Sequence, residues 1–323
     1  MQSLLLILTG LILFLYALNN LSEGLKYLAG DRLKAFLDRF TSNIFSGIIS
    51  GAIVTILLDS SSVVIIMTIA LVSSRAMTFR QAMGVVMGAN IGTTVSSQIF
   101  ALDVGAYAAF PILAGFVMMF LIKSQFYKQL GRVIFSFGLL FFGLFTMEDA
   151  VEPLKESDYF ISWLQSLENT WKGMFTGAFV TIVVQSSSAT VGMVIGLASQ
   201  GMITIAAGIA VMLGAELGTC ADTLIASVGR TKAAVKTGLF HLLFNVFTIL
   251  IGMVVLPWFT QLVLLISKNS SAQQTIANAH MLFNLFGVLI MLPFVGAYER
   301  LLNHLIPGVE GAVSPDSPTE LAQ

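Results

Sequence analysis

Charged residues are scarce in this sequence. Asp, Glu, Lys and Arg make up 10% of its 323 residues, whereas a soluble globular domain carries about 25%. The single cysteine, Cys220, excludes an internal disulfide framework, and a net charge of −1 leaves no basic face for nucleic acid. Hydrophobic residues account for 56% of the chain, and its mean hydropathy is +0.90. Because these few charges cannot cover a water-facing surface, the sequence predicts an all-α integral membrane protein.

The two ends of the chain carry their own expectations. The first apolar segment, residues 3–20, has no basic leader and no small-residue cleavage site, so we interpret it as a retained helix and not as a signal peptide. Residues 306–323 are polar and contain proline and glycine. This tail is predicted to be disordered, and it is too short to form a second, soluble domain.

An internal repeat organises the chain. Residues 51–100 align without gaps on residues 177–226, an offset of 126, with 19 identities in 50 pairs. GAIVTILLDSSS matches GAFVTIVVQSSS, and GVVMGANIGTT matches AVMLGAELGTC. The repeat predicts two related halves, residues 1–128 and 129–258, followed by a final transmembrane helix within 259–305.

Apolar length predicts where the chain crosses the membrane, because one span needs roughly 17–25 apolar residues. Two segments, 43–74 and 173–200, are too long for one span and too short for two, and each has three serines at its centre. We expect both to form re-entrant helical hairpins with the serines at the tip. The charged amphipathic stretches 29–40 and 153–168 are predicted to lie at the membrane interface. Full spans are predicted over 3–22, 83–102, 106–122, 133–147, 207–228, 237–257 and 276–298.

The charged loops predict that the two halves are inverted. Basic residues favour the cytoplasmic side, which places Arg75, Arg80 and the loop 230–236 inside the cell. The loops that correspond to these by the repeat, 201–206 and 104–110, carry no charge. Equivalent loops of opposite charge character indicate an inverted topology in the cell (inner) membrane, with the N-terminus outside and the C-terminus in the cytoplasm.

Polar residues at the interface of two inverted halves are the candidates for a binding site. Hydroxyls and amides can replace the water shell of an oxyanion, and carboxylates can replace that of a hard cation such as sodium. A lone membrane serine often bonds only to its own helix, but six serines at two equivalent tips favour a site. The candidate substrate ligands are Ser60, Ser61, Ser62, Gln185, Ser186, Ser187, Ser188, Asn90, Thr93 and Thr219. The candidate ligands for sodium or a proton are Asp59, Glu216, Thr94, Thr190, Asp222 and Thr223.

Two further patterns have a purely structural interpretation. His241 and His280 occupy twin motifs, HLLFN and HMLFN, in which a histidine and an asparagine lie four residues apart. We interpret them as helix-packing pairs in preference to groups that handle a proton or the substrate. The glycine pairs at 47/51 and 173/177 would let each hairpin pack closely on a neighbour.

These motifs resemble those of the type II sodium–phosphate cotransporters and their bacterial relatives, whose hallmark is QSSS in each of two inverted repeats followed by a GANIGTT-like segment. VQSSSAT (184–190), GANIGTT (88–94) and HLLFN (241–245) match, and 10–30 looks like the family's opening segment. The resemblance covers roughly residues 5–305. It implies sodium-coupled symport of inorganic phosphate by alternating access, with sodium as the coupling ion, no organic cofactor and no enzymatic activity. It also implies a member without a C-terminal PhoU-like domain, and it is compatible with a homodimer.

Two positions depart from the family's pattern. Asp59 stands where the first QSSS should begin, and Glu216 replaces the asparagine of GANIGTT in the second half. Two carboxylates beside a dianionic phosphate are strongly unfavourable in a low-dielectric site. We therefore predict that Asp59 and Glu216 bind coupling cations or protons.

Other functions remain open at this point. The two acids favour, as an alternative, a carrier for another small anion, or a cation- or proton-coupled carrier, on the same scaffold. An intramembrane serine hydrolase that pairs a serine with His241 or His280 has little support, because no Gly-x-Ser-x-Gly elbow is present. A passive channel could also use re-entrant loops. Rocking and elevator-like movements are both compatible with the pattern.

Overall fold

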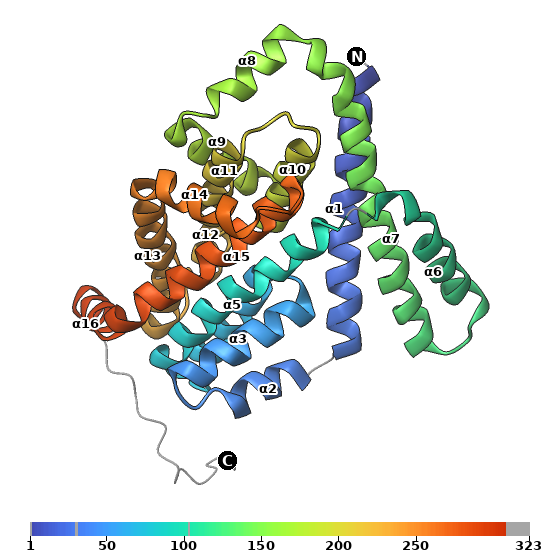
Figure 1. Cartoon of the computed structure of the whole chain (residues 1–323). Helices are drawn as coiled ribbons and strands as arrows, with labels where there is room; N and C mark the ends of the chain where they lie inside the picture. The colour runs from blue at the N-terminus through green and yellow to red at the C-terminus, as the bar shows by residue number, and fades with distance from the viewer. Residues whose placement is uncertain (1, 30–31, 103, 308–323) are drawn as a thin grey trace.

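A computed structural model describes residues 2–29, 32–102 and 104–307 (Figure 1). Within these ranges every regular element is a helix, which confirms the all-α prediction. The tail predicted to be disordered, 306–323, lies outside the described residues from 308 onward.

The first part of the chain contains one long helix, an interfacial segment, a helical hairpin and two further helices. They are α1 (Gln2–Ala29), α2 (Arg32–Phe40), α3 (Ile44–Leu58), α4 (Ser61–Ser73), α5 (Phe79–Phe100), the 3-10 turn η1 (Gly105–Tyr107) and α6 (Ala109–Leu121).

The second part follows the same order and then adds helices at its end. Its elements are α7 (Gln125–Val151), the 3-10 turn η2 (Glu152–Glu156), α8 (Asp158–Ser166), α9 (Thr170–Val184), α10 (Ser187–Ser199), α11 (Ile205–Gly218), α12 (Cys220–Ser227), α13 (Lys232–Val254), α14 (Leu256–Ile266), α15 (Ala272–Met291), the 3-10 turn η3 (Leu292–Phe294) and α16 (Val295–Leu305).

Five helical stretches in the described residues are long and apolar enough to cross a membrane, and a bent pair makes a sixth candidate. That pair is α5 with η1 and α6, which meet at 76°. The 13 residues of α6 extend only about 20 Å, less than the roughly 30 Å of a hydrocarbon core. The span predicted over 106–122 is therefore shorter than a full crossing. The five stretches are Leu5–Ala29, Gln125–Glu156, Ile205–Ser227, Lys232–Val254 and Ala272–Leu305.

The helix α14 was not anticipated as a separate element within 259–305.

Both serine-centred segments break at their serines, as the sequence predicts. In the first hairpin, α3 ends at Asp59, whose φ of 52° lies in the left-handed region, and the Ser60 side chain caps α4. In the second, Gln185 ends α9 with a φ of 56°, and Ser186 caps α10. A left-handed residue stops the first helix and a serine hydroxyl starts the next, so each chain segment reverses sharply at its centre.

Close glycine contacts hold each hairpin against its following helix. A Cβ atom on Gly51 would collide with the carbonyl of Val85, and one on Gly88 would collide with that of Ile48. These contacts join α3 to α5 backbone to backbone, as small residues permit.

The second half makes the same contacts 126 residues later. Gly177 abuts the carbonyl of Val211, and Gly214 abuts that of Met174, so α9 packs on α11 as α3 packs on α5. The repeat seen in the sequence is therefore a repeat of backbone packing.

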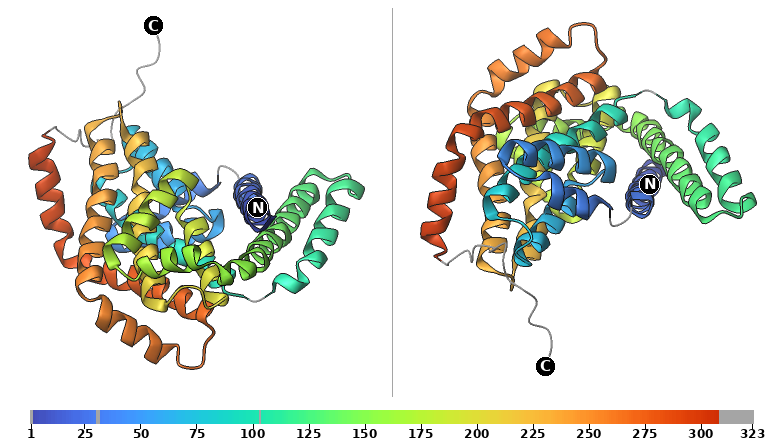
Figure 2. Two further views of the ribbon diagram at one scale, coloured as in Figure 1. Left: turned by 90° about the horizontal axis from the view of Figure 1, so that it is seen from above. Right: turned by 90° about the horizontal axis from the view of Figure 1, so that it is seen from below.

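The helices form two layers. The long helices α1 and α7 run antiparallel, with Gly10 against Gly143 and Gly24 against Val133, and α6 packs on the outer side of α7. Figures 1 and 2 show these three helices to one side of the hairpins and of α11–α16. Figure 1 also places α2 and α8, which precede the two hairpins, at opposite ends of the molecule.

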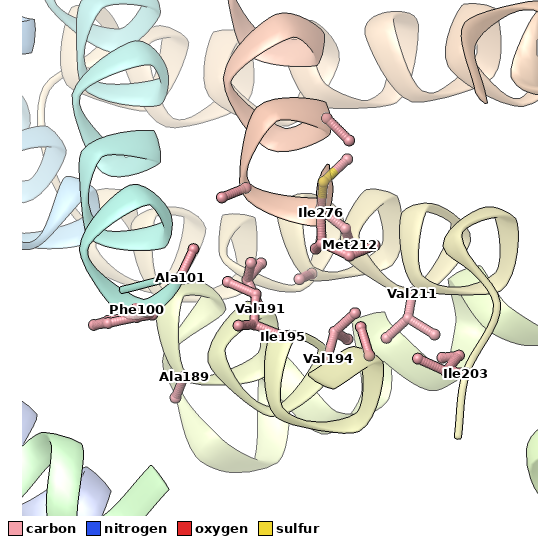
Figure 3. Close-up of a cluster of buried hydrophobic side chains, with 14 of the residues drawn as sticks. Phe100, Ala101, Ala189, Val191, Val194, Ile195, Ile203, Val211, Met212 and Ile276 are labelled. Atoms are coloured by element: carbon pink, nitrogen blue, oxygen red, sulfur yellow. The ribbon is translucent and has the colours of Figure 1, made fainter. Parts of the chain in front are cut away.

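The core of the larger layer is apolar and lies between the hairpins and their neighbours. In Figure 3, side chains from α5, α10, α11 and α15 converge on one cluster. The two helices that carry the twin motifs cover equivalent elements, because α13 packs against α4 and α15 packs against α10. The second helix of each hairpin is thereby covered on one face. The labelled members of the cluster are Phe100, Ala101, Ala189, Val191, Val194, Ile195, Ile203, Val211, Met212 and Ile276.

Candidate substrate and cation site

The tips of the two hairpins meet the opposite halves of the molecule. The Ser62 hydroxyl lies 3.3 Å from the Thr219 hydroxyl, and the Ser188 hydroxyl lies 3.4 Å from the Thr93 hydroxyl. Ser62 and Ser188 are equivalent by the repeat, and so are Thr93 and Thr219. One contact is thus made twice, and each copy joins the hairpin of one half to the GANIGTT-like segment of the other.

The serines of each triplet have different positions. The Ser60 side chain accepts a hydrogen bond from the Val63 amide at 3.3 Å, and Ser186 accepts one from the Ala189 amide at 3.1 Å. The middle serines, Ser61 and Ser187, are the buried first residues of α4 and α10. First-turn amide groups of two helices are therefore present at the tips, and such amides attract anions because the N-terminal end of a helix carries partial positive charge.

Asp59 lies on the side of the first tip that faces α1 and α7. Its carboxylate accepts a hydrogen bond from the Ser96 hydroxyl on α5. Both residues line a cavity of about 230 Å³ whose other walls are apolar. The Ser22 hydroxyl on α1 donates to the carbonyl of Leu58, the residue before Asp59, at 2.9 Å.

Asp222 is an acidic residue that contacts a serine of the first tip. It lies on α12, is half-buried, and accepts a hydrogen bond from the Ser62 hydroxyl at 3.5 Å. Ser62 thus stands between a threonine hydroxyl and a carboxylate of the second half. The structure brings Ser62, Thr219 and Asp222, three of the candidate ligands, together.

Glu216 has partners inside the protein. It is 1% exposed, and its Oε1 atom lies 2.6 Å from the Nε2 atom of His280 and 3.1 Å from the Nδ2 atom of Asn284. The other ring nitrogen of His280, Nδ1, lies 2.6 Å from the Ser97 hydroxyl. This network connects α5, α11 and α15, and it compensates a buried carboxylate that would otherwise be very unfavourable.

His241 forms the matching network in the second half. Its Nδ1 atom lies 2.8 Å from the Thr223 hydroxyl and its Nε2 atom 3.1 Å from the Asn245 amide. Thr223 is the repeat equivalent of Ser97, so each histidine bonds to an equivalent hydroxyl. The interpretation as a His–Asn packing pair describes His241, whereas His280 in addition bonds to a carboxylate.

The other candidates have local partners. Asn90 donates to the Val86 carbonyl at 2.9 Å, and Thr94 donates to the Ile91 carbonyl at 2.7 Å, both within α5. Thr190 accepts from the Thr181 hydroxyl at 2.8 Å inside the second hairpin. Gln185 is exposed at its left-handed position. These hydrogen bonds do not bring Asn90, Thr94 or Thr190 into the contacts between the two halves.

Sequence reasoning missed Ser96 and Ser97, and it interpreted Asn284 only as the helix-packing partner of His280. A signal was present, because the repeat pairs Ser96 with Asp222 and Ser97 with Thr223, both of which were candidates. Extending each candidate to its repeat equivalent would have found the two serines.

A helical membrane protein whose two broken hairpins each contact the opposite half through hydroxyl groups has an architecture that transporters use. The Na+/Pi-cotransporter family model matches residues 13–149 and 154–292, and the chain belongs to this family, which is one of transporters and not of enzymes. The chain is 28% identical over 302 residues to the uncharacterized protein YqeW of Bacillus subtilis, covering 93% of this chain and 97% of that protein.

Two further relatives have names that refer to phosphate. The putative inorganic phosphate export protein YjbB of Escherichia coli is 26% identical over 309 residues, which cover 95% of this chain but 56% of YjbB. The human sodium-dependent phosphate transport protein 2B is 36% identical over 101 residues, 31% of this chain and 15% of that protein. No solved structure matches the chain.

Proposed function

We propose that this protein carries inorganic phosphate across the cell (inner) membrane, coupled to sodium, by alternating access. The observation that supports this function best is the doubled contact between Ser62 and Thr219 and between Ser188 and Thr93. It joins the serine tip of each half to the threonine of the other, at the interface where transporters with broken helices bind their substrates.

The chemistry of the tips suits an oxyanion. Hydroxyl groups and the first-turn amides of α4 and α10 can donate several hydrogen bonds to phosphate oxygens. The serines of the two tips, with Thr93 and Thr219, are the proposed phosphate ligands. Family membership and the names of YjbB and of protein 2B support phosphate as the substrate.

The acids near the tips suit a coupling cation. Asp59 ends α3 and Asp222 contacts Ser62, so both carboxylates lie near the tips, where a sodium ion would offset the charge of phosphate. The C-terminal ends of broken helices also attract sodium in transporters. We give Glu216 a different role from the one first expected, because its Oε1 atom already bonds His280 and Asn284: it stabilises the contact between α11 and α15.

Inverted topology remains part of the proposal. It is supported by the opposite charge character of equivalent loops and by the placement of α2 and α8 at opposite ends of the molecule (Figure 1). In this arrangement the N-terminus is outside and the C-terminus is cytoplasmic. The layer of α1, α6 and α7 and the layer of hairpins then form two bodies that can move against each other to expose the site on either side.

The test is phosphate flux in proteoliposomes. Radiolabelled phosphate should accumulate when an inward sodium gradient is imposed, and accumulation should stop when potassium replaces sodium on both sides. Reversing the gradient measures whether net export, as in the name of YjbB, is also possible. Absence of sodium-dependent phosphate flux in folded protein would refute the proposal, and competition by other oxyanions would reveal a different substrate.

A further inference from the structure

The two halves carry one carboxylate each at equivalent pairs of positions, but on opposite members of the pair. In the first half, the left-handed tip residue is Asp59 and the facing residue on α5 is Ser96. Their repeat equivalents are Gln185 at the second tip and Asp222 on α12. The acid has changed places between tip and span, and each pair of positions retains one carboxylate.

The surroundings of Asp59 supply further oxygen atoms. Asp59 follows the last turn of α3, where carbonyl groups carry the negative end of the helix dipole. One turn earlier, the Thr55 hydroxyl is fully buried and has no hydrogen-bond partner among the described residues. The equivalent hydroxyl, Thr181, bonds to Thr190, but the first half has Val64 at that position. The Asp59 carboxylate, the Ser96 hydroxyl that bonds to it and the C-terminus of α3 are hard oxygen ligands that suit sodium. The Thr55 side chain lies one turn away, against Gly92 of α5.

The cavity beside Asp59 explains why the charge state of this residue matters for movement. Its walls on α1 and α7 are apolar, including Leu21, Leu25, Val133 and Phe137. An ionised carboxylate cannot slide along such a wall without a large desolvation cost, whereas a neutralised one can. Asp59 lies at the boundary between the two layers that the proposed mechanism moves.

We propose that Asp59 and Ser96 form a sodium site. Its acid lies at the hairpin tip, whereas the acid of the equivalent pair, Gln185 and Asp222, lies on the following span. Sodium bound to Asp59 permits the first hairpin to move along α1 and α7. Only the movement of the hairpin rests on the proposed transport function. Sodium binding by itself can be measured without phosphate.

The exchange suggests its own test, in which the arrangement of the second half is copied into the first. Asp59→Gln removes the acid from the tip, and adding Ser96→Asp restores it on the span. Ser96→Asp alone is the matched control that leaves two facing carboxylates. Sodium binding is measured in detergent as the thermal shift produced by sodium chloride against choline chloride, without phosphate. Transport is measured as sodium-driven phosphate uptake in proteoliposomes.

We expect Asp59→Gln to need about ten times as much sodium for the same thermal stabilisation, because the site loses its charged ligand. The double variant should regain most of the sodium affinity and of the uptake that Asp59→Gln loses. The Ser96→Asp control should lower uptake, because two adjacent carboxylates repel each other. Unfolding temperatures in choline chloride show whether each variant is folded.

Two results would overturn the inference. One is an Asp59→Gln protein with the sodium dependence of the wild type. The other is a folded double variant that recovers neither binding nor uptake. If the wild type binds sodium through Asp59 but moves no phosphate, the proposed function fails while the sodium site stands. If only the proton dependence changes in Asp59→Gln, the sodium site is refuted.

Discussion

The first and second hairpins have the same backbone and different charges. Both end their first helix at a left-handed residue, both cap the next helix with a serine, and both pack on their following helix through paired glycines. The loops after them also agree, since Arg75 and its equivalent Gly201 both have positive φ. The polar side chains differ, because Asp59 corresponds to Gln185 in the repeat and Ser96 corresponds to Asp222. Glycines and serines fix the shape of each half, and the remaining polar positions are free to give each half its own chemistry.

The largest difference between the halves should appear at the two histidines. Replacing His280 by Leu takes the Nε2 hydrogen-bond partner from the buried Glu216 carboxyl, and an unsatisfied buried group of this kind costs about 1–3 kcal/mol, or more when it is charged. Replacing His241 by Leu removes one hydrogen bond each from Thr223 and Asn245, which keep their bonds to the Cys220 and Glu216 carbonyls, so the cost should be about 0.5–1.5 kcal/mol. Thermal unfolding in detergent should therefore show a larger loss for His280→Leu. Equal losses would show that the Glu216 contact is not the distinguishing feature.

The glycine contacts should show the opposite result, a close match between halves. Gly88→Ala and Gly214→Ala each place a methyl group against a carbonyl of the facing helix, and overpacking of this kind costs about 1–3 kcal/mol. The two losses should agree within about 0.5 kcal/mol. Gly296, which has nothing within 4 Å of a built Cβ, provides the control position. A large loss at only one glycine would contradict equivalent packing.

The serine contacts are expected to affect transport more than stability. Ser62→Ala and Ser188→Ala should each lower apparent phosphate affinity about tenfold, the value of one good hydrogen bond. Ser62→Ala should have the larger effect, because Ser62 also bonds Asp222. Ser162→Ala, at an exposed serine of α8, is the matched control. Uptake kinetics in proteoliposomes measure all three variants. An unchanged phosphate KM in both tip variants would show that the tips do not bind the substrate.

The smallest effect is expected at Val64. Val64→Thr recreates the Thr181–Thr190 pair of the second half and gives the Thr55 hydroxyl a partner. Stability should rise by about 0.5–1.5 kcal/mol, as for one internal hydrogen bond. If Thr55 is also a sodium ligand, the same variant should weaken sodium-dependent stabilisation. Thr190→Val, the reverse change in the second half, should lower stability and leave the sodium response of the first half unchanged.

Much of the fold followed from the sequence, because its signals were local. Apolar length and the serine triplets predicted the helices and the two breaks. The glycine pairs at 47/51 and 173/177 predicted that each hairpin packs closely on a neighbour, and the structure shows that these neighbours are α5 and α11. The shortness of α6 was missed, since its apolar residues 106–122 have the composition of a full span. The separate helix α14 was missed for a similar reason, because residues 259–305 were assigned to one final transmembrane helix.

The site was predicted in part, because contacts between distant helices have no local signal. The serine tips and Asp222 were candidates, and the structure brings Ser62, Thr219 and Asp222 together. The bond between His280 and Glu216 joins residues 64 positions apart, and α15 lies beyond the aligned repeat. Only the packing of α15 against α10 and α11 reveals that Glu216 has its own partners.

The left-handed conformation of Asp59 and Gln185 has a consequence for protein engineering. Residues other than glycine, asparagine and aspartate pay an energetic penalty in this region, and even aspartate is less favourable there than glycine. A library selected only for heat resistance should therefore enrich glycine at both positions. Such a selection would improve the turns while discarding the acid of the first one, so thermostabilised variants of this carrier need a flux assay at every round.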